Sequence, residues 1–139
     1  VHKEYLALVA GRVKPDQGTI EAPIGRNRAN RQKMDIVPEG REARTGFRVL
    51  ERFASYSFLR LKLETGRTHQ IRVHLAAIGH PIVGDAVYGS GAASLGLDRP
   101  FLHAWYLGFE LLAGEACLVC WAPLPAELAD VLSRLRAEL

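Results

Sequence analysis

The sequence has few residues that could form a disulfide or a metal site. Its 139 residues include one methionine and two cysteines, Cys117 and Cys120. A zinc site would need a second pair of ligands at finger-like spacing, and a thioredoxin-like site would need the cysteine pair to open a helix after a strand. Residues three apart on a strand point to opposite faces, so we expect both cysteines to be buried or half-buried thiols.

Motifs of several large enzyme classes are also missing. There is no G-x-x-x-x-G-K phosphate loop and no G-x-S-x-G motif, so a nucleotide-hydrolysing or ester-hydrolysing enzyme has no support. His69, His74 and His80 have neither the i, i+4 spacing nor the glutamate of an H-E-x-x-H site. We therefore expect no bound metal.

Long hydrophobic runs are absent as well. No run of eighteen apolar residues and no charged-then-apolar leader occurs, so we expect neither a membrane span nor a signal peptide and predict a cytoplasmic protein. The composition, 48% hydrophobic and 24% charged residues, is that of one globular domain with a single core.

Positive charge is concentrated in one segment, residues 26–52. The net charge of the chain is only +3. Within residues 26–52, four acidic residues oppose eight basic ones: Arg26, Arg28, Arg31, Lys33, Arg41, Arg44, Arg48 and Arg52. Such an excess in a nearly neutral domain is typical of a surface that binds a polyanion, although a solvated basic loop would have the same composition.

The pattern of apolar residues predicts an α+β fold with a mixed, largely antiparallel sheet, a short central helix and a C-terminal helix. We expect a basic loop over residues 25–31 and a last helix, Ala126–Glu138, with Pro125 at its first position and four apolar residues facing the core: Leu128, Val131, Leu132 and Leu135. Strands are expected at residues 2–11, 19–23, 32–37, 41–53, 56–63, 102–112 and 116–121, with the fourth and fifth forming a hairpin.

The residues 64–85 are the stretch around which the chain is organised. Thr68 is a candidate N-cap of the central helix, and Gly79 stands where a left-handed residue would end it. Between them, Ile71, Leu75 and Ile78 recur at helical spacing and should face the core.

Four side chains that can donate hydrogen bonds gather at the start of this helix: Arg67, His69, Gln70 and Arg72. We interpret them as an anion-binding cluster, because a helix N-terminus already attracts negative charge. The alternative is a solvated flank, or an arginine that pairs with a structural carboxylate. Together with exposed-looking tyrosines, Tyr5, Tyr56, Tyr88 and Tyr106, the cluster indicates an RNA-binding surface, although strand tyrosines also serve in cores.

The central stretch resembles the signature of the RluA-type pseudouridine synthases. The resemblance rests on LETGRTHQIRVH at residues 63–74, GHPIVGD at 79–85 and YG at 88–89. Supporting pieces follow the family's order: KEYLA at 3–7, ART at 43–45, LHA at 102–104 and APLP at 122–125. The similarity therefore covers nearly the whole chain.

The resemblance implies a cofactor-free isomerase that makes pseudouridine from uridine in rRNA or tRNA. In this family a catalytic aspartate attacks, a tyrosine lies against the flipped base and an arginine pairs with the aspartate. By position in the motifs, the tyrosine is Tyr5 and the arginine is Arg72. The resemblance also leads us to expect Leu102 in the apolar wall of the pocket, and Arg67, His69, Gln70 and Arg44 as substrate-binding residues.

The sequence departs from the family in one respect. The catalytic aspartate belongs to a His-Arg-Leu-Asp motif that precedes the Lys-x-Tyr strand, and residues 1–139 contain no such motif. Asp85 lies in the Gly-Asp turn, where we expect a structural role. We therefore expect the chain to be the C-terminal part of a catalytic domain whose N-terminal segment is missing. The alternative is a non-catalytic RNA-binding module without a nucleophile.

Overall fold

We describe the structure from a computed structural model. It covers residues 2–89, 94–111 and 116–139, with side chains described outside residues 109–119. The main strands are β1 (His2–Ala10), β2 (Gln17–Glu21), β5 (Arg44–Arg52), β6 (Tyr56–Leu63), β7 (Leu102–Leu111) and β8 (Ala116–Trp121). Two short strands, β3 (Ile24–Arg26) and β4 (Met34–Ile36), and two helices, α1 (Gln70–Ala77) and α2 (Ala126–Ala137), complete the described part.

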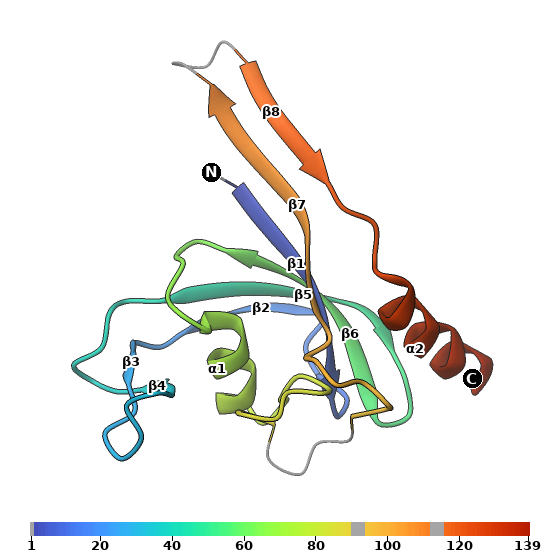
Figure 1. Ribbon diagram of the computed structural model, residues 1–139, viewed down its shortest axis with the longest axis horizontal. Helices are drawn as coiled ribbons and strands as arrows, with labels where there is room; N and C mark the ends of the chain where they lie inside the picture. The colour runs from blue at the N-terminus through green and yellow to red at the C-terminus, as the bar shows by residue number, and fades with distance from the viewer. Residues whose placement is uncertain (1, 90–93, 112–115) are drawn as a thin grey trace.

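A six-stranded sheet forms the centre of the molecule, in the order β2-β5-β6-β1-β7-β8 (Figure 1). Each neighbouring pair in this order is antiparallel. The strands β3 and β4 form a separate antiparallel pair. The predicted fold class, an α+β fold with a largely antiparallel sheet, a short central helix and a C-terminal helix, is thus confirmed.

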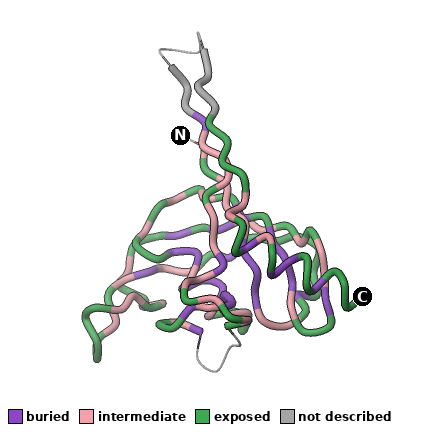
Figure 2. The backbone as a smooth tube through the Cα atoms, turned by 45° about the vertical axis from the view of Figure 1, so that its right-hand side comes forward, coloured by how far each residue is buried: buried purple, intermediate pink, exposed green. Residues whose placement is uncertain are grey.

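One main core holds the sheet and α2 together. Ala7, Leu8 and Val9 of β1 are completely buried, and so are Leu59 and Leu61 of β6. Figure 2 shows the buried residues gathered in the body of the molecule, around the crossing of these strands. The strict alternation of apolar and polar residues at the end of β6 predicted one wet face, and the structure confirms it.

The C-terminal helix packs as its periodicity predicted. Its four apolar residues all enter the main core: Leu128, Val131, Leu132 and Leu135. Pro125 is the N-cap and not the first helical residue. This difference of one position leaves the buried stripe unchanged, because the stripe depends only on spacing.

Three local predictions were wrong. Residues 24–26, assigned in part to a loop, form β3 and pair with β4, because Ile24 is buried and gives this short strand a core contact. Ile78 is 40% exposed, since the helix ends before it. Cys120 is exposed on β8. The side chain of Cys117 lies outside the described side chains.

The two helices approach opposite faces of the sheet. Cross-strand pairing places Thr45 on the same face as Leu63, whereas Glu51 pairs with Phe58 on the other face. In the structure Thr45 contacts α1 through a hydrogen bond, and Glu51 binds Arg136 of α2. We call the face that carries Thr45 the α1 face.

The segment 81–85 follows α1 and crosses the end of β1. Val83 donates a backbone hydrogen bond to Leu8 and accepts one from Phe101. Gly84 then turns the chain with φ +81°, a conformation that favours glycine. A Cβ on Gly84 would overlap the carbonyl of Arg99, so the turn depends on glycine for space as well as for backbone angle.

Substitution of Gly84 by alanine should destabilise the fold. We expect the free energy of unfolding to fall by at least about 2 kcal/mol, because a left-handed backbone and a steric overlap both oppose the added methyl group. Chemical denaturation measures the loss. The matched control is Gly66→Ala, where nothing lies within 4 Å of the added Cβ. Equal stability of the two variants would contradict the prediction.

Candidate functional site

The helix α1 begins one residue later than predicted. Its N-cap is His69 and not Thr68, and no side chain caps it by a hydrogen bond. His69 has φ 54° and ψ 22°, a left-handed conformation that costs a non-glycine residue free energy. Such strain persists only where neighbouring contacts impose it, and it gathers at functional sites.

The side chain of Gln70 holds the turn before α1. Its Oε1 accepts hydrogen bonds from the Thr65 hydroxyl at 2.7 Å and from the Arg67 N–H at 3.0 Å. Its Nε2 donates to the Arg44 carbonyl at 2.7 Å and to Thr45 Oγ1 at 3.0 Å. Gln70 is only 2% exposed. The two bonds from Nε2 tie the helix start to β5, and the two that Oε1 accepts hold the turn of residues 65–67 against it.

The hydrogen bonds continue through Thr45 to a buried histidine. Thr45 Oγ1 lies 2.8 Å from His74 Nδ1, and His74 Nε2 lies 3.0 Å from the Ala22 carbonyl oxygen. Because the carbonyl can only accept, Nε2 carries a proton and Nδ1 accepts from the threonine hydroxyl. Both Thr45 and His74 are completely buried. We call Gln70, Thr45, His74 and Ala22 the α1 anchor.

Arg72 projects from the same helix and forms a two-point ion pair with Asp85. Its Nε donates to Oδ2 at 2.8 Å and its Nη2 to Oδ1 at 2.9 Å. The side chain of Asp85 is completely buried, and that of Arg72 is 18% exposed. Asp85 Oδ1 also accepts from the N–H groups of Val87 and Tyr88, each at 3.0 Å.

The shifts in pKa favour the ionised forms of both Asp85 and Arg72. Burial alone would raise the pKa of Asp85, but the hydrogen bonds from Arg72, Tyr88 and Val87 outweigh it and lower that pKa. The hydrogen bond to Asp85 raises the pKa of Arg72, against a smaller effect of burial. Asp85 therefore has the structural role expected from the sequence, and its partner is Arg72.

Tyr88 covers the guanidinium of Arg72. Its ring centroid lies 5.1 Å from the guanidinium carbon and 5.6 Å from Lys33 Nζ. The Tyr88 hydroxyl accepts from the Met34 N–H at 2.9 Å and lies 2.9 Å from His69 Nδ1. Burial, and next the charge of Arg72, lower the pKa of His69, so a neutral ring can accept at Nδ1 from the tyrosine.

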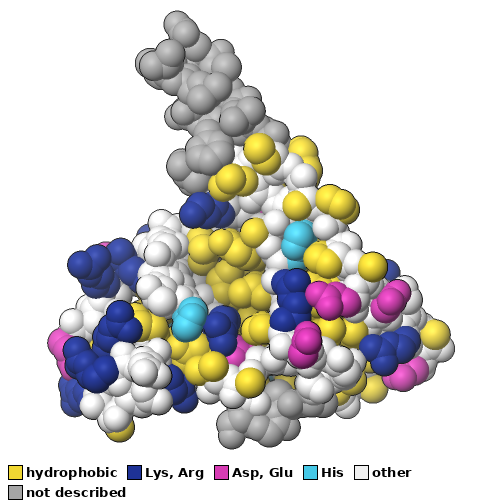
Figure 3. Space-filling model, viewed as in Figure 1, with side chains coloured by type: hydrophobic (Ala, Val, Ile, Leu, Met, Phe, Trp, Pro, Cys, Tyr) yellow, Lys and Arg dark blue, Asp and Glu magenta, His cyan; other side chains and the backbone are white. Residues whose placement is uncertain are grey.

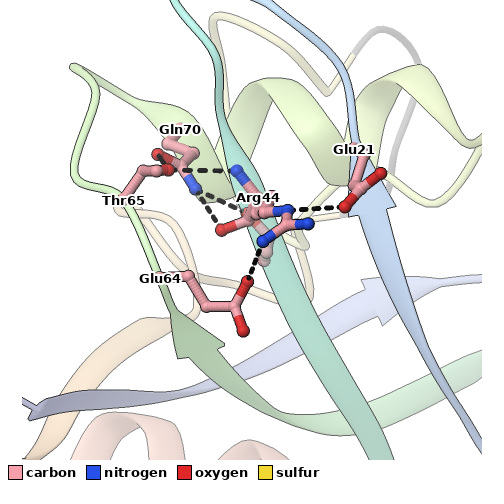
Figure 4. Close-up of polar contacts among 6 residues, drawn as sticks. Glu21, Arg44, Glu64, Thr65 and Gln70 are labelled. Carbon is pink, nitrogen blue, oxygen red and sulfur yellow. Dashed lines mark hydrogen bonds and ion pairs between the residues drawn. The ribbon is translucent and has the colours of Figure 1, made fainter.

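The other two predicted arginines, Arg44 and Arg67, lie at the edge of this region, and Figure 4 shows the contacts of Arg44. The Arg44 guanidinium is placed between Glu21 and Glu64, and its backbone binds Gln70 and Thr65. The Arg67 side chain donates through Nε to the Glu42 carbonyl at 2.8 Å. Both arginines thus have protein partners in the structure.

Tyr5 and Leu102 lie on the α1 face, away from the helix. Tyr5 pairs with Leu61 and Ala104, and Leu102 pairs with Ala7. Both side chains are half-buried and pack against the main core. Tyr5 lines an open cavity of about 370 Å³ with Ala104, Trp121 and other residues of β7 and β8. Figure 3 shows a hydrophobic patch on this side of the molecule, with basic and histidine side chains beside it.

The structure divides the seven predicted residues into three groups. Arg72 and His69 meet through Tyr88, as described above. Arg67 and Arg44 lie around the turn before α1, and the buried side chain of Gln70 bonds to the backbone of both. Tyr5 and Leu102 share the sheet face with α1, but neither Leu102 nor Arg72 lines the cavity that contains Tyr5.

Sequence reasoning missed Thr45, His74 and, as the partner of Arg72, Asp85. It named Tyr88 as an aromatic residue of the expected RNA-binding surface but not its contacts with His69 and Arg72. One signal was present for His74, because Gln70 and His74 are polar residues at i, i+4 beside a buried stripe. The pairing of Arg72 with Asp85 has no comparable signal, since it joins residues from a helix and a separate turn.

Comparison with known proteins shows that the chain is similar to RNA pseudouridine synthases. The sequence model of the family described as RNA pseudouridylate synthase matches residues 1–77. An uncharacterized RNA pseudouridine synthase of Chloroflexus aurantiacus is 53% identical over 136 residues, which cover 98% of this chain and 43% of that protein. Ribosomal large subunit pseudouridine synthase D of Nitrosomonas europaea is 45% identical over 143 residues, covering 98% of this chain and 41% of that protein.

Solved structures are similar over the same extent. The human RNA pseudouridylate synthase domain containing 1 superposes with a TM-score of 0.79 at 32% identity, covering 98% of this chain and 66% of that one. Of the two curated relatives, from Chloroflexus aurantiacus and Nitrosomonas europaea, the chain spans less than half the length. In the described residues we find no helix long and apolar enough to cross a membrane, and no group of three side chains able to hold a metal.

The α1 anchor should make stability depend on pH. Burial lowers the pKa of His74, against an opposing effect of the Ala22 carbonyl. Below about pH 6.5 the unfolded chain therefore binds more protons than the folded one at this residue. We expect the free energy of unfolding to fall as the pH drops from 7 to 5, by up to about 1.4 kcal/mol per pH unit from His74 alone.

Chemical denaturation of the unmodified chain and of His74→Gln at several pH values measures how the free energy of unfolding depends on pH. Glutamine can donate to Ala22 and accept from Thr45 without titrating, so the slope with pH should decrease. His103→Gln, on β7 outside the anchor, is the matched control and should keep the slope. An unchanged slope in His74→Gln would refute the prediction.

Proposed function

The chain belongs to the RNA pseudouridylate synthase family, and we propose that it supplies part of the site at which a longer protein converts uridine in RNA into pseudouridine. In this reaction the N1–C1′ bond of the nucleoside breaks, C5 bonds to C1′, the C5 proton leaves and N1 gains a proton. The supporting observation is that Arg72 and Tyr5 lie at the same face of one sheet, Arg72 held in place and Tyr5 half-buried.

Arg72 is proposed to orient the catalytic aspartate. A guanidinium that is largely buried, stacked and charged can keep a carboxylate ionised and aimed. The nucleophile itself is proposed to come from residues outside this chain, because the 139 residues contain no His-Arg-Leu-Asp motif. In this proposal, Arg72 binds an aspartate carboxylate that another part of the longer protein supplies.

Tyr5 and Leu102 are proposed to form the base pocket. A uridine can be modified only after it leaves the base stack, and it then needs an apolar or aromatic wall. The cavity beside Tyr5 has such walls on β7 and β8. Half-burial keeps both side chains in contact with the core while one surface remains available.

The remaining predicted residues are proposed to serve RNA binding in two ways. His69 and Arg67 lie where RNA phosphates could reach them at the start of α1. Gln70 is proposed to act indirectly, because its amide is buried and engaged by the protein. Arg44 would contact RNA only by exchanging one of its glutamates for a phosphate.

The RNA substrate is proposed to be rRNA, with tRNA as the second choice. The Nitrosomonas europaea relative is named for the large ribosomal subunit, and this name is the support for that order. The cytoplasm stays our predicted location. A non-catalytic RNA-binding module is the competing proposal, favoured only by the absence of the nucleophile motif from these residues.

The 139-residue chain by itself should not isomerise uridine. The measurement is release of tritium from RNA labelled at C5 of uridine, with the full-length protein as the positive control. Circular dichroism should show that the chain is folded under the same conditions. Tritium release by the chain alone would mean that the nucleophile lies within residues 1–139.

Replacement of Arg72 by alanine in the full-length protein should abolish turnover. We expect the rate at saturating RNA to fall at least about 100-fold, because the aspartate loses its electrostatic partner. The dissociation constant for RNA should change by less than about threefold, since the arginine acts on the reaction step. Arg134→Ala, on the exposed side of α2, is the control. Near-normal turnover of Arg72→Ala would remove Arg72 from the site.

A further inference from the structure

We propose that Asp85 is a positioning residue that occupies the Nε–Nη2 edge of the Arg72 guanidinium and leaves the adjacent Nη1–Nη2 edge to receive the nucleophile's carboxylate. The inference rests on the proposed function. It assigns Asp85 a second task beyond its turn, and it specifies the geometry in which one arginine binds two carboxylates.

The first observation is that Asp85 has little freedom to move. Its side chain is completely buried, and its Oδ1 accepts from the backbone N–H groups of Val87 and Tyr88 while also binding Arg72. Glycines stand on both sides of this turn. A Cβ on Gly89 would overlap the Asp85 carbonyl, and one on Gly84 would overlap the Arg99 carbonyl. The tight turn thus fixes the carboxylate.

The second observation concerns which donors of Arg72 are used. A guanidinium has five N–H groups, and Asp85 takes Nε–H and one hydrogen of Nη2. The other Nη2 hydrogen and one Nη1 hydrogen point in parallel from the adjacent Nη1–Nη2 edge, and the second Nη1 hydrogen points toward the Cδ side. Within the described residues, no hydrogen bond from Nη1 is present, and the side chain is 18% exposed. That edge can bind a second carboxylate through two parallel hydrogen bonds.

The third observation is that the plane of the guanidinium is fixed as well. Tyr88 covers one face at 5.1 Å, and the tyrosine is itself held by Met34 and His69. Asp85 fixes rotation within the plane, and Tyr88 limits tilt out of it. The orientation of the Nη1–Nη2 edge is therefore fixed before a carboxylate binds to it.

The arrangement has an electrostatic consequence for the nucleophile. The charged groups near Arg72 are the Asp85 carboxylate and, on the Tyr88 ring, Lys33; the imidazole of His69, whose pKa is lowered, is a titratable group beside the same ring. A carboxylate that shares its arginine with Asp85 is stabilised less than one with the arginine to itself, because like charges disfavour ionisation. Removal of the Asp85 charge should then make the nucleophile more acidic.

The test is Asp85→Asn in the full-length protein, assayed for uridine isomerisation across pH. Asparagine keeps the size of the side chain and removes its charge. We expect kcat to fall about 10- to 100-fold, as a misplaced guanidinium would cause, with KM changed by less than about threefold. We also expect the acidic limb of the kcat profile to move to lower pH. The matched control is Asp130→Asn on the exposed side of α2, which should leave kcat and the position of the acidic limb unchanged.

The outcomes separate this inference from the proposed function. If the unmodified full-length protein does not isomerise uridine, the proposed function fails. If that protein is active, a folded Asp85→Asn variant with a kcat within twofold of it, or with an unmoved acidic limb, overturns the inference. A simple loss of stability would lower the amount of active enzyme without moving the limb.

A crystal structure of the unmodified full-length protein decides the matter should Asp85→Asn not fold. The expected result is Asp85 on Nε and Nη2 of Arg72, with a second carboxylate within hydrogen-bond distance of Nη1. Any other arrangement, including displacement of Asp85 from Nε by the nucleophile, overturns the inference.

Discussion

The buried hydrogen bonds between α1 and β5 are the constraint on which the site depends. An eight-residue helix is too short to be stable alone, and the α1 anchor holds it in one position on the sheet. Each of these polar groups is buried, so each would cost free energy if its partner were lost. The orientation of the helix is therefore specified by bonds with direction, where apolar packing alone would allow it to slide.

This anchor explains how a short helix serves two purposes. Gln70 and His74 lie one turn apart and face inward, whereas His69 and Arg72 project toward the turn that contains Asp85 and Tyr88. The strained backbone of His69 fits the same picture, because its ring is held by Tyr88 just where the chain enters the helix. Side chains that anchor the helix and side chains of the candidate site thus alternate over residues 69–74.

The sequence predicted the sheet and both helices well, because they depend on local periodicity. Leu59 and Leu61 alternate with Arg60 and Lys62, and this alternation alone indicates one buried face. The start of α1 was predicted less well. Thr68 has the residue type of an N-cap, yet the structure ends the turn at His69, because contacts with Tyr88 outweigh the local preference.

The candidate site was also predicted only as far as local sequence determines it, because the surroundings of its side chains are set by residues distant in the sequence. Four donors in six residues suggested one anion-binding cluster, but nothing in that spacing distinguishes a donor that faces the core from one that faces Tyr88 and Asp85. Gln70 is buried because Thr65 and the Arg44 carbonyl, distant in sequence, surround it. The roles of Tyr5 and Arg72 came from family resemblance and stay predictions.

The ion pair with Asp85 also explains how Arg72 can be largely buried in a chain that lacks its proposed partner. An unpaired guanidinium would not remain desolvated, because the loss of hydration would exceed any gain from packing. Asp85 supplies the compensating charge from within the same chain. The guanidinium is therefore held in place within this chain, and the proposed nucleophile-bearing segment would need only to bind a preformed edge. Pre-organisation of this kind lowers the cost of assembling a site from parts that are far apart in the sequence.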